Sequence, residues 1–143
     1  MSKILVLDTN ILLRAVFGVN VPTLLDKYKN EADYLTPEHC YNELRKHAYN
    51  IGQKRGVPAN DIGQAISWLE MVIGAIPITV YKHKEADAKN RIRERDLDDW
   101  PILALALALN CAVWTEDHDF FGTGVSTWNS RNIEIFLSST SNS

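Results

Sequence analysis

Cysteine is scarce in this sequence, and long hydrophobic runs are missing. Cys40 and Cys111 are the only two cysteines in 143 residues, so a disulfide-stabilised scaffold is excluded and free thiols in a reducing compartment are expected. The apolar run after Lys3 is too short for a signal peptide, and the run from Trp100 to Leu109 is far too short for a membrane span. We therefore expect a soluble, cytoplasmic protein.

The sequence also lacks an excess of positive charge. Fifteen lysines and arginines stand against 18 aspartates and glutamates, which gives a formal net charge of −3. This balance excludes a strongly basic protein that binds nucleic acid through charge alone, but it suits an enzyme that gathers carboxylates around metal ions. With 45% hydrophobic residues the chain can bury one sizeable core. We expect a single domain over residues 1–138 and a disordered tail at 139–143.

Short apolar or β-prone runs alternate with helical patterns along the chain. The runs that predict strands lie at residues 4–7, 34–35, 77–81, 111–114 and, as an edge strand, 125–128. The patterns that predict helices lie at residues 11–17, from about 22, at 37–49, 61–73, 82–95, about 99–110 and 130–137. This alternation predicts an α/β fold, a three-layer α/β/α sandwich around a central, mostly parallel sheet.

Acidic residues follow two of the predicted strands. Asp8 comes directly after residues 4–7, and Asp117 follows the strand that ends at Trp114. Ligands of open α/β sheets lie outside the carboxyl ends of the strands, so neighbouring strands would bring both carboxylates into one crevice. Asp99 begins the helix that leads into the second strand, and spacing alone leaves open whether it reaches that crevice. Glu43 lies at the edge of an apolar helix stripe, where most glutamates are simply solvated.

Three segments of the chain, taken together, resemble the PIN-domain ribonucleases. They are Val6-Leu7-Asp8-Thr9-Asn10-Ile11-Leu12, then Asp99-Trp100-Pro101-Ile102-Leu103-Ala104-Leu105-Ala106, and Trp114-Thr115-Glu116-Asp117-His118-Asp119-Phe120. The resemblance spans almost the whole chain. The opening LDTN is common alone, but its combination with the other two segments in this order is fairly specific. It implies a PIN-like parallel sheet and a catalytic, metal-binding quartet of Asp8, Glu43, Asp99 and Asp117. Asp119 is kept as a secondary ligand, and Thr9, Asn10 and Thr115 are expected to line the site.

The chemistry that the resemblance implies is metal-dependent hydrolysis of RNA. Clustered carboxylates repel one another unless a cation neutralises them, and hard cations such as Mg²⁺ or Mn²⁺ prefer oxygen ligands. The family reaction is endonucleolytic and leaves 5′-phosphates and 3′-hydroxyls. RNA also needs positive charge near the acids. The candidate cations are Lys89, Arg91, Arg93, Arg95 and Arg45, although the cations between Lys82 and Arg95 spread around a helix and suit a solvated surface equally well.

Other functions are compatible with an aspartate after the first strand. A dehalogenase-type phosphatase needs a second aspartate where this chain has Asn10, and a receiver-type phosphoacceptor needs a lysine that does not follow Trp114. The main alternative is a catalytically silent PIN-like module that binds RNA or a protein. Within the enzyme class, the small size favours the toxin of a toxin–antitoxin pair, with a small antitoxin as partner and a homodimer as the expected assembly. The RNA substrate is left open.

Overall fold

One all-parallel sheet of five strands organises the protein. The computed structural model describes residues 3–93 and 96–139. The strands are β1 (Lys3–Leu7), β2 (Ala32–Pro37), β3 (Ile73–Ile76), β4 (Ala112–Trp114) and β5 (Thr127–Trp128). They lie in the order β3-β2-β1-β4-β5, and every neighbouring pair is parallel. The prediction of a parallel sheet is therefore confirmed.

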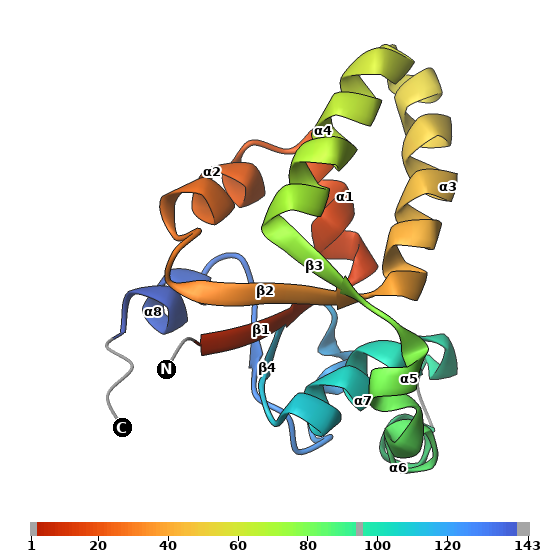
Figure 1. The fold of residues 1–143 in the computed structure, drawn as a ribbon, viewed down its shortest axis with the longest axis vertical. Helices are drawn as coiled ribbons and strands as arrows, with labels where there is room; N and C mark the ends of the chain where they lie inside the picture. Colours follow the sequence, from red (N-terminus) through yellow and green to blue (C-terminus); the bar gives the residue numbers. More distant parts are fainter. Residues whose placement is uncertain (1–2, 94–95, 140–143) are drawn as a thin grey trace.

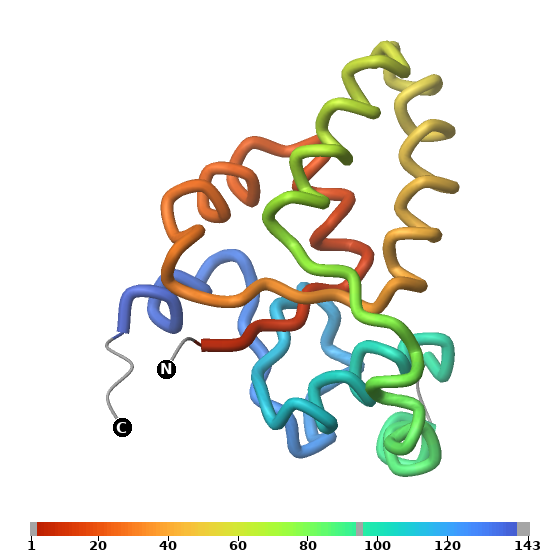
Figure 2. Tube along the Cα trace, viewed as in Figure 1, coloured from red at the N-terminus to blue at the C-terminus, as the bar shows by residue number. Residues whose placement is uncertain are grey.

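Helices cover both faces of this sheet, so the sandwich is also confirmed. They are α1 (Thr9–Phe17), α2 (Asn20–Lys27), α3 (Glu38–Arg55), α4 (Ala59–Val72), α5 (Ile78–Tyr81), α6 (Glu85–Ile92), α7 (Trp100–Leu109) and α8 (Ile133–Ser138). Figure 1 shows α1, α3 and α4 on one side of β1 and β2, and α5, α6 and α7 on the other. The tube in Figure 2 shows the same division along the chain, since the segment from β3 onwards crosses from the first side to the second.

The centre of the core is formed by β1 and α7. Leu5, Val6 and Leu7 are fully buried, as expected for a strand covered on both faces. Helix α7 is apolar around its whole circumference, and its residues from Pro101 to Ala106 are buried. A helix of that kind is stable only when it is enclosed by other elements, and α7 packs against β1, β2 and β4. In the described part of the chain, no helix has the length and apolar character needed to cross a bilayer.

The predicted strand at residues 77–81 is wrong. The third strand is Ile73–Ile76, and Ile78–Tyr81 form a helical turn that follows Pro77. Proline before the first turn is well suited to starting a helix. The turn buries Tyr81, whose ring meets the ring of Trp100 edge-on at a centroid distance of 5.8 Å. This packing outweighs the β preference of the residues between them, since β propensity depends strongly on context.

The helix predicted at residues 37–49 is longer than expected. Helix α3 continues to Arg55 and ends at Gly56, which has a left-handed φ of 73°. Gly52 therefore lies inside the helix, where the Ile62 side chain of α4 fills the space that a Cβ would need. The other predicted elements are present with ends shifted by at most three residues. Apart from Ser139, the predicted tail lies outside the described residues.

Candidate metal and catalytic site

The carboxyl ends of β1 and β4 lie side by side, so the condition that the sequence analysis set for a shared crevice is met. Leu7 is in register with Trp114 in the parallel pairing of the two strands. One residue after the end of β1, the backbone N–H of Asp8 donates to the carbonyl oxygen of Trp114 at 3.4 Å. The residues that follow each strand therefore enter the same region of the sheet edge.

Asp8 is buried at this edge and is held by two donors. It is the N-cap of α1, and its Oδ1 accepts from the backbone N–H of Ile11 at 2.9 Å. Its Oδ2 accepts from the hydroxyl of Thr115. Only 6% of Asp8 is exposed. Burial raises the pKa of its carboxyl from 3.8 to about 6, and repulsion from Asp117 adds to the rise although both hydrogen bonds oppose it.

Thr115 links Asp8 to the next acid in the chain. Its hydroxyl donates to Asp8 and accepts from the backbone N–H of Asp117 at 2.9 Å. The side chain is 3% exposed, so its two partners hold it in one orientation. One buried hydroxyl thus fixes the turn after β4 against the end of β1.

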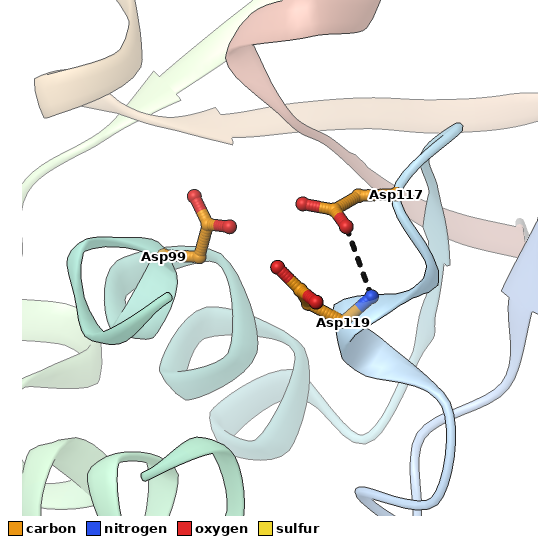
Figure 3. A group of neighbouring side chains, drawn as sticks. All are labelled: Asp99, Asp117 and Asp119. Atoms are coloured by element: carbon orange, nitrogen blue, oxygen red, sulfur yellow. Dashed lines mark hydrogen bonds between the residues drawn. The ribbon is translucent and has the colours of Figure 1, made fainter. Parts of the chain in front are cut away.

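Asp99, Asp117 and Asp119 come together next to this turn. One carboxylate oxygen from each lies within 4.8 Å of the others. Figure 3 shows Asp99 at the start of α7 facing the other two across a small gap. Asp117 caps the 3₁₀ turn His118–Phe120, because its Oδ1 accepts from the backbone N–H of Asp119 at 2.9 Å. Asp119, predicted as a secondary ligand, therefore lies in the same group as Asp99 and Asp117.

The question that spacing left open for Asp99 is answered by the direction of α7. The C-terminal end of the helix leads within a few residues into β4, so its N-terminal end lies at the carboxyl edge of the sheet. Burial raises the pKa of Asp99 from 3.8 to about 7, and repulsion from Asp96, Asp117 and Asp8 adds to this. The acids are thus close enough to resist ionising together, which is the property that a bound cation would relieve.

Glu43 reaches the region from α3 without joining the group of three. Its Oε1 accepts from the hydroxyl of Thr9 at 3.0 Å, and Thr9 directly follows Asp8. The same oxygen lies 3.5 Å from Nε2 of His39, one helical turn earlier. The i, i+4 spacing of the two residues on α3 is the sequence signal that links His39 to Glu43. Asn10, the third expected lining residue, is exposed in the first turn of α1.

The candidate basic residues are mostly engaged with nearby carboxylates. Lys89 pairs with Glu85 at 2.6 Å, and Arg45 pairs with Glu70 at 3.4 Å. Arg91 pairs with Asp87 at 2.9 Å and donates to the carbonyl oxygen of Thr123 at 2.6 Å. Arg93 is exposed, and Arg95 lies outside the described residues. Their role in binding RNA stays a prediction.

Comparison with known proteins identifies the family. The profile of the PIN domain matches residues 6–138, a span that includes all the acids described above. The chain belongs to the PIN domain family. No curated protein gives a significant match to this PIN domain.

Solved structures confirm the PIN-like fold. A chain in the crystal structure of VapBC2 from Rickettsia felis bound to a DNA fragment from their promoter superposes with a TM-score of 0.70 at 14% identity, covering 89% of this chain and 98% of that one. A chain in the structure of VapBC-1 from nontypeable Haemophilus influenzae gives a TM-score of 0.60 at 21% identity, covering 90% and 99%. At these identities the likeness concerns the fold.

Proposed function

We propose that this PIN domain is a metal-dependent endoribonuclease that hydrolyses RNA phosphodiester bonds. The observation that carries the proposal is the group formed by Asp99, Asp117 and Asp119, which lies at the carboxyl edge of the sheet beside the buried Asp8. Family membership supports the same activity. A module that only binds RNA or protein would have no need to bury Asp8 and Asp99 among other acids, where burial, and repulsion after it, raises their pKa values.

The donor set fits Mg²⁺ or Mn²⁺. All the groups offered are carboxylate oxygens, which hard cations prefer. Two oxygens on opposite sides of one Mg²⁺ are separated by about 4 Å, given metal–oxygen distances of about 2.0–2.1 Å. The three oxygens lie within 4.8 Å of one another, so small side-chain rotations would bring them to a shared ion. Asp99, Asp117 and Asp119 would hold the ion directly, and Asp8 directly or through water.

The residues of the site would divide the work of hydrolysis. A bound cation would supply charge neutralisation at the scissile phosphate and a water of lowered pKa. Thr115 would hold Asp8 in a fixed orientation beside the group of three aspartates, through the hydroxyl that also anchors Asp117. Glu43, which accepts a hydrogen bond from Thr9, would either complete the ligand set or orient the attacking water. The products would carry a 5′-phosphate and a 3′-hydroxyl.

We further propose that the protein acts as the toxin of a toxin–antitoxin pair in the cytoplasm. The likeness to chains of two VapBC structures supports this assignment. A small antitoxin would then be its protein partner and a homodimer its assembly, with RNA as the substrate. Lys89, Arg91, Arg93, Arg95 and Arg45 are the proposed phosphate contacts, and each would bind more weakly as salt increases.

The test is cleavage of a mixed pool of single-stranded and structured RNA by the purified protein in Mg²⁺, in Mn²⁺ and in EDTA. We expect cleavage that needs metal, leaves 5′-phosphates and is lost in Asp117→Asn. Asp26→Asn is the matched control, since Asp26 is an exposed aspartate on α2, away from the sheet edge. Intact RNA under all conditions, with metal still bound, would favour the silent binding module instead. Cleavage that persists in EDTA and in Asp117→Asn would refute the proposed site.

A further inference from the structure

A pocket of about 430 Å³ opens beside the acidic site, between α3, α5 and the start of α7. It shares Glu43 with the site, and its lining residue Asp98 directly precedes Asp99. The pocket is of a size that holds small organic groups. A strand of RNA with its phosphate at the acids would have a neighbouring base within reach of this opening.

The walls of the pocket suit a flat aromatic ring. Trp100 is partly buried, and Tyr81 holds it edge-on with 61° between the ring planes. Ile78, also in the lining, is 46% exposed although it is a large apolar residue. The ammonium group of Lys89 lies 5.3 Å from the centroid of the Trp100 ring and brings a positive charge close to it. Unpaired nucleobases stack on aromatic side chains of this kind.

Two carboxylates, those of Glu43 and Asp98, line the pocket together with the imidazole of His39. The Glu43 carboxylate already lies 3.5 Å from Nε2 of His39. Asp98 uses its backbone N–H to bind Asp96, whereas its exposed carboxylate has no hydrogen-bond or ion-pair partner among the described residues. An ionised carboxylate only accepts hydrogen bonds, and it does so best from two parallel donors. Among the four RNA bases, only guanine presents two adjacent N–H donors, N1–H and N2–H, on its Watson–Crick edge. Adenine and cytosine place a ring acceptor beside the amino group, and uracil has one N–H between two carbonyls.

We propose that this pocket binds an unpaired guanine next to the cleaved phosphate, with Trp100 as the stacking surface and Asp98 as the reader of the guanine edge. The inference rests on the proposed ribonuclease function, and it specifies the substrate as single-stranded RNA containing guanine. Guanine would thus be favoured at one position close to the cleavage point.

The decisive measurement is the binding of fluorescein-labelled hexaribonucleotides, observed by anisotropy with the cleavage-deficient Asp117→Asn chain in Mg²⁺. Each probe is a uridine oligomer that carries one guanine, adenine, cytosine or inosine. Inosine lacks the N2 amino group and keeps the rest of the ring system. We expect guanine to bind about tenfold more tightly than inosine or adenine, in line with a bidentate contact. Adding Asp98→Asn should bring guanine to the level of inosine, whereas adding Asp26→Asn should change nothing.

A second variant separates the stacking contribution of Trp100 from the recognition of the guanine edge by Asp98. Trp100→Ala should weaken all four probes by a similar factor of about ten, because stacking accepts any base. Equal binding of guanine and inosine, or a guanine preference that survives Asp98→Asn, would overturn the proposal. Cleavage assays with the chain that keeps Asp117 distinguish the guanine-pocket proposal from the ribonuclease proposal. Cleavage without any Asp98-dependent base preference refutes only the guanine-pocket proposal. An Asp98-dependent guanine preference in a chain that cleaves no RNA refutes the nuclease alone.

Discussion

Replacing Asp8 by asparagine is expected to stabilise the metal-free protein at neutral pH. The carboxylate of Asp8 is buried close to Asp117 and Asp99, so its negative charge is unfavourable in the folded state. Asparagine has the same shape and no charge. Its carbonyl can accept from the N–H of Ile11, and its amide can donate to the hydroxyl of Thr115.

The size of the effect follows from the pKa of Asp8. A pKa raised from 3.8 to about 6 means that ionised Asp8 lowers the free energy of unfolding by about 3 kcal/mol. This penalty is nearly absent below pH 3.8, grows as the pH rises through the folded-state pKa of about 6, and levels off near pH 7. Rearranged hydrogen bonds should cost the variant about 1 kcal/mol. A net gain of about 2 kcal/mol at pH 7 is therefore expected. Asp99 acts in the same direction, because neutralising Asp8 removes a charge that raises the pKa of Asp99.

Urea unfolding in EDTA, followed by tryptophan fluorescence between pH 4 and 8, tests this reasoning. The difference in unfolding free energy between Asp8→Asn and the wild type should grow with pH and level off above about pH 7. For Asp26→Asn the difference should stay near zero throughout, since Asp26 is exposed. Mg²⁺ should stabilise the wild type more than Asp8→Asn, since the variant keeps Asp99, Asp117 and Asp119 but loses one of the acids of the site. A difference that does not change with pH, or a variant less stable than wild type at pH 7, would refute the electrostatic explanation.

Three further changes test other parts of the structure. Thr115→Val should raise the pKa of Asp8 above about 6 in a ¹³C carboxyl titration of the metal-free protein, because the hydrogen bond from the Thr115 hydroxyl lowers that pKa. Thr115→Ser keeps a hydroxyl and should leave the pKa near the wild-type value. Equal pKa values in the two variants would contradict the effect of this hydrogen bond on Asp8. Leu103→Ala should lower the free energy of unfolding in urea by about 2–5 kcal/mol, because Leu103 is fully buried. Ile135→Ala, at a position that is 65% exposed, should lower it by less than about 0.5 kcal/mol. Similar losses in the two variants would argue against the burial of α7. Gly56→Ala should lower the free energy of unfolding by about 1 kcal/mol and the melting temperature by a few degrees, because alanine disfavours the φ of 73° at this position. Steric overlap would not contribute, since nothing lies within 4 Å of the added Cβ. An unchanged melting temperature would contradict the left-handed cap.

The central strands could be predicted because their signals are local. Residues 4–7 form a continuous apolar run that ends at an aspartate, and the structure buries Leu5 to Leu7 completely. Residues 111–114 form a second apolar run, of which Ala112 to Trp114 are buried in β4. Once both runs are taken as parallel strands, their carboxyl ends must share an edge if they are neighbours, which the pairing of β1 with β4 confirms. No long-range information was needed beyond the rule for open α/β sheets.

The errors occur where tertiary packing decides. Nothing in the sequence marks a break between α4 and β3, and Ile73 ends one element and begins the other. Residues 78–81 have β-prone side chains, but burial of Tyr81 against Trp100 holds them in a helical turn. Gly52 looks like a helix end in the sequence. The side chain that makes it acceptable, Ile62, belongs to the next helix.

Whether the sequence predicts that an acid belongs to the site depends on which structural feature places its side chain there. Asp8 and Asp117 follow strand ends, so topology alone places them. Asp119 is only a secondary ligand in the sequence prediction, because it lies farther from the strand end than Asp117. The 3₁₀ turn that Asp117 caps brings the Asp119 carboxylate alongside. Glu43 depends on the packing of α3 beside α1, where Thr9 donates to it, and no spacing within α3 encodes that contact. Acids set by strand ends can therefore be read from sequence, whereas those set by turn geometry or helix packing need the fold.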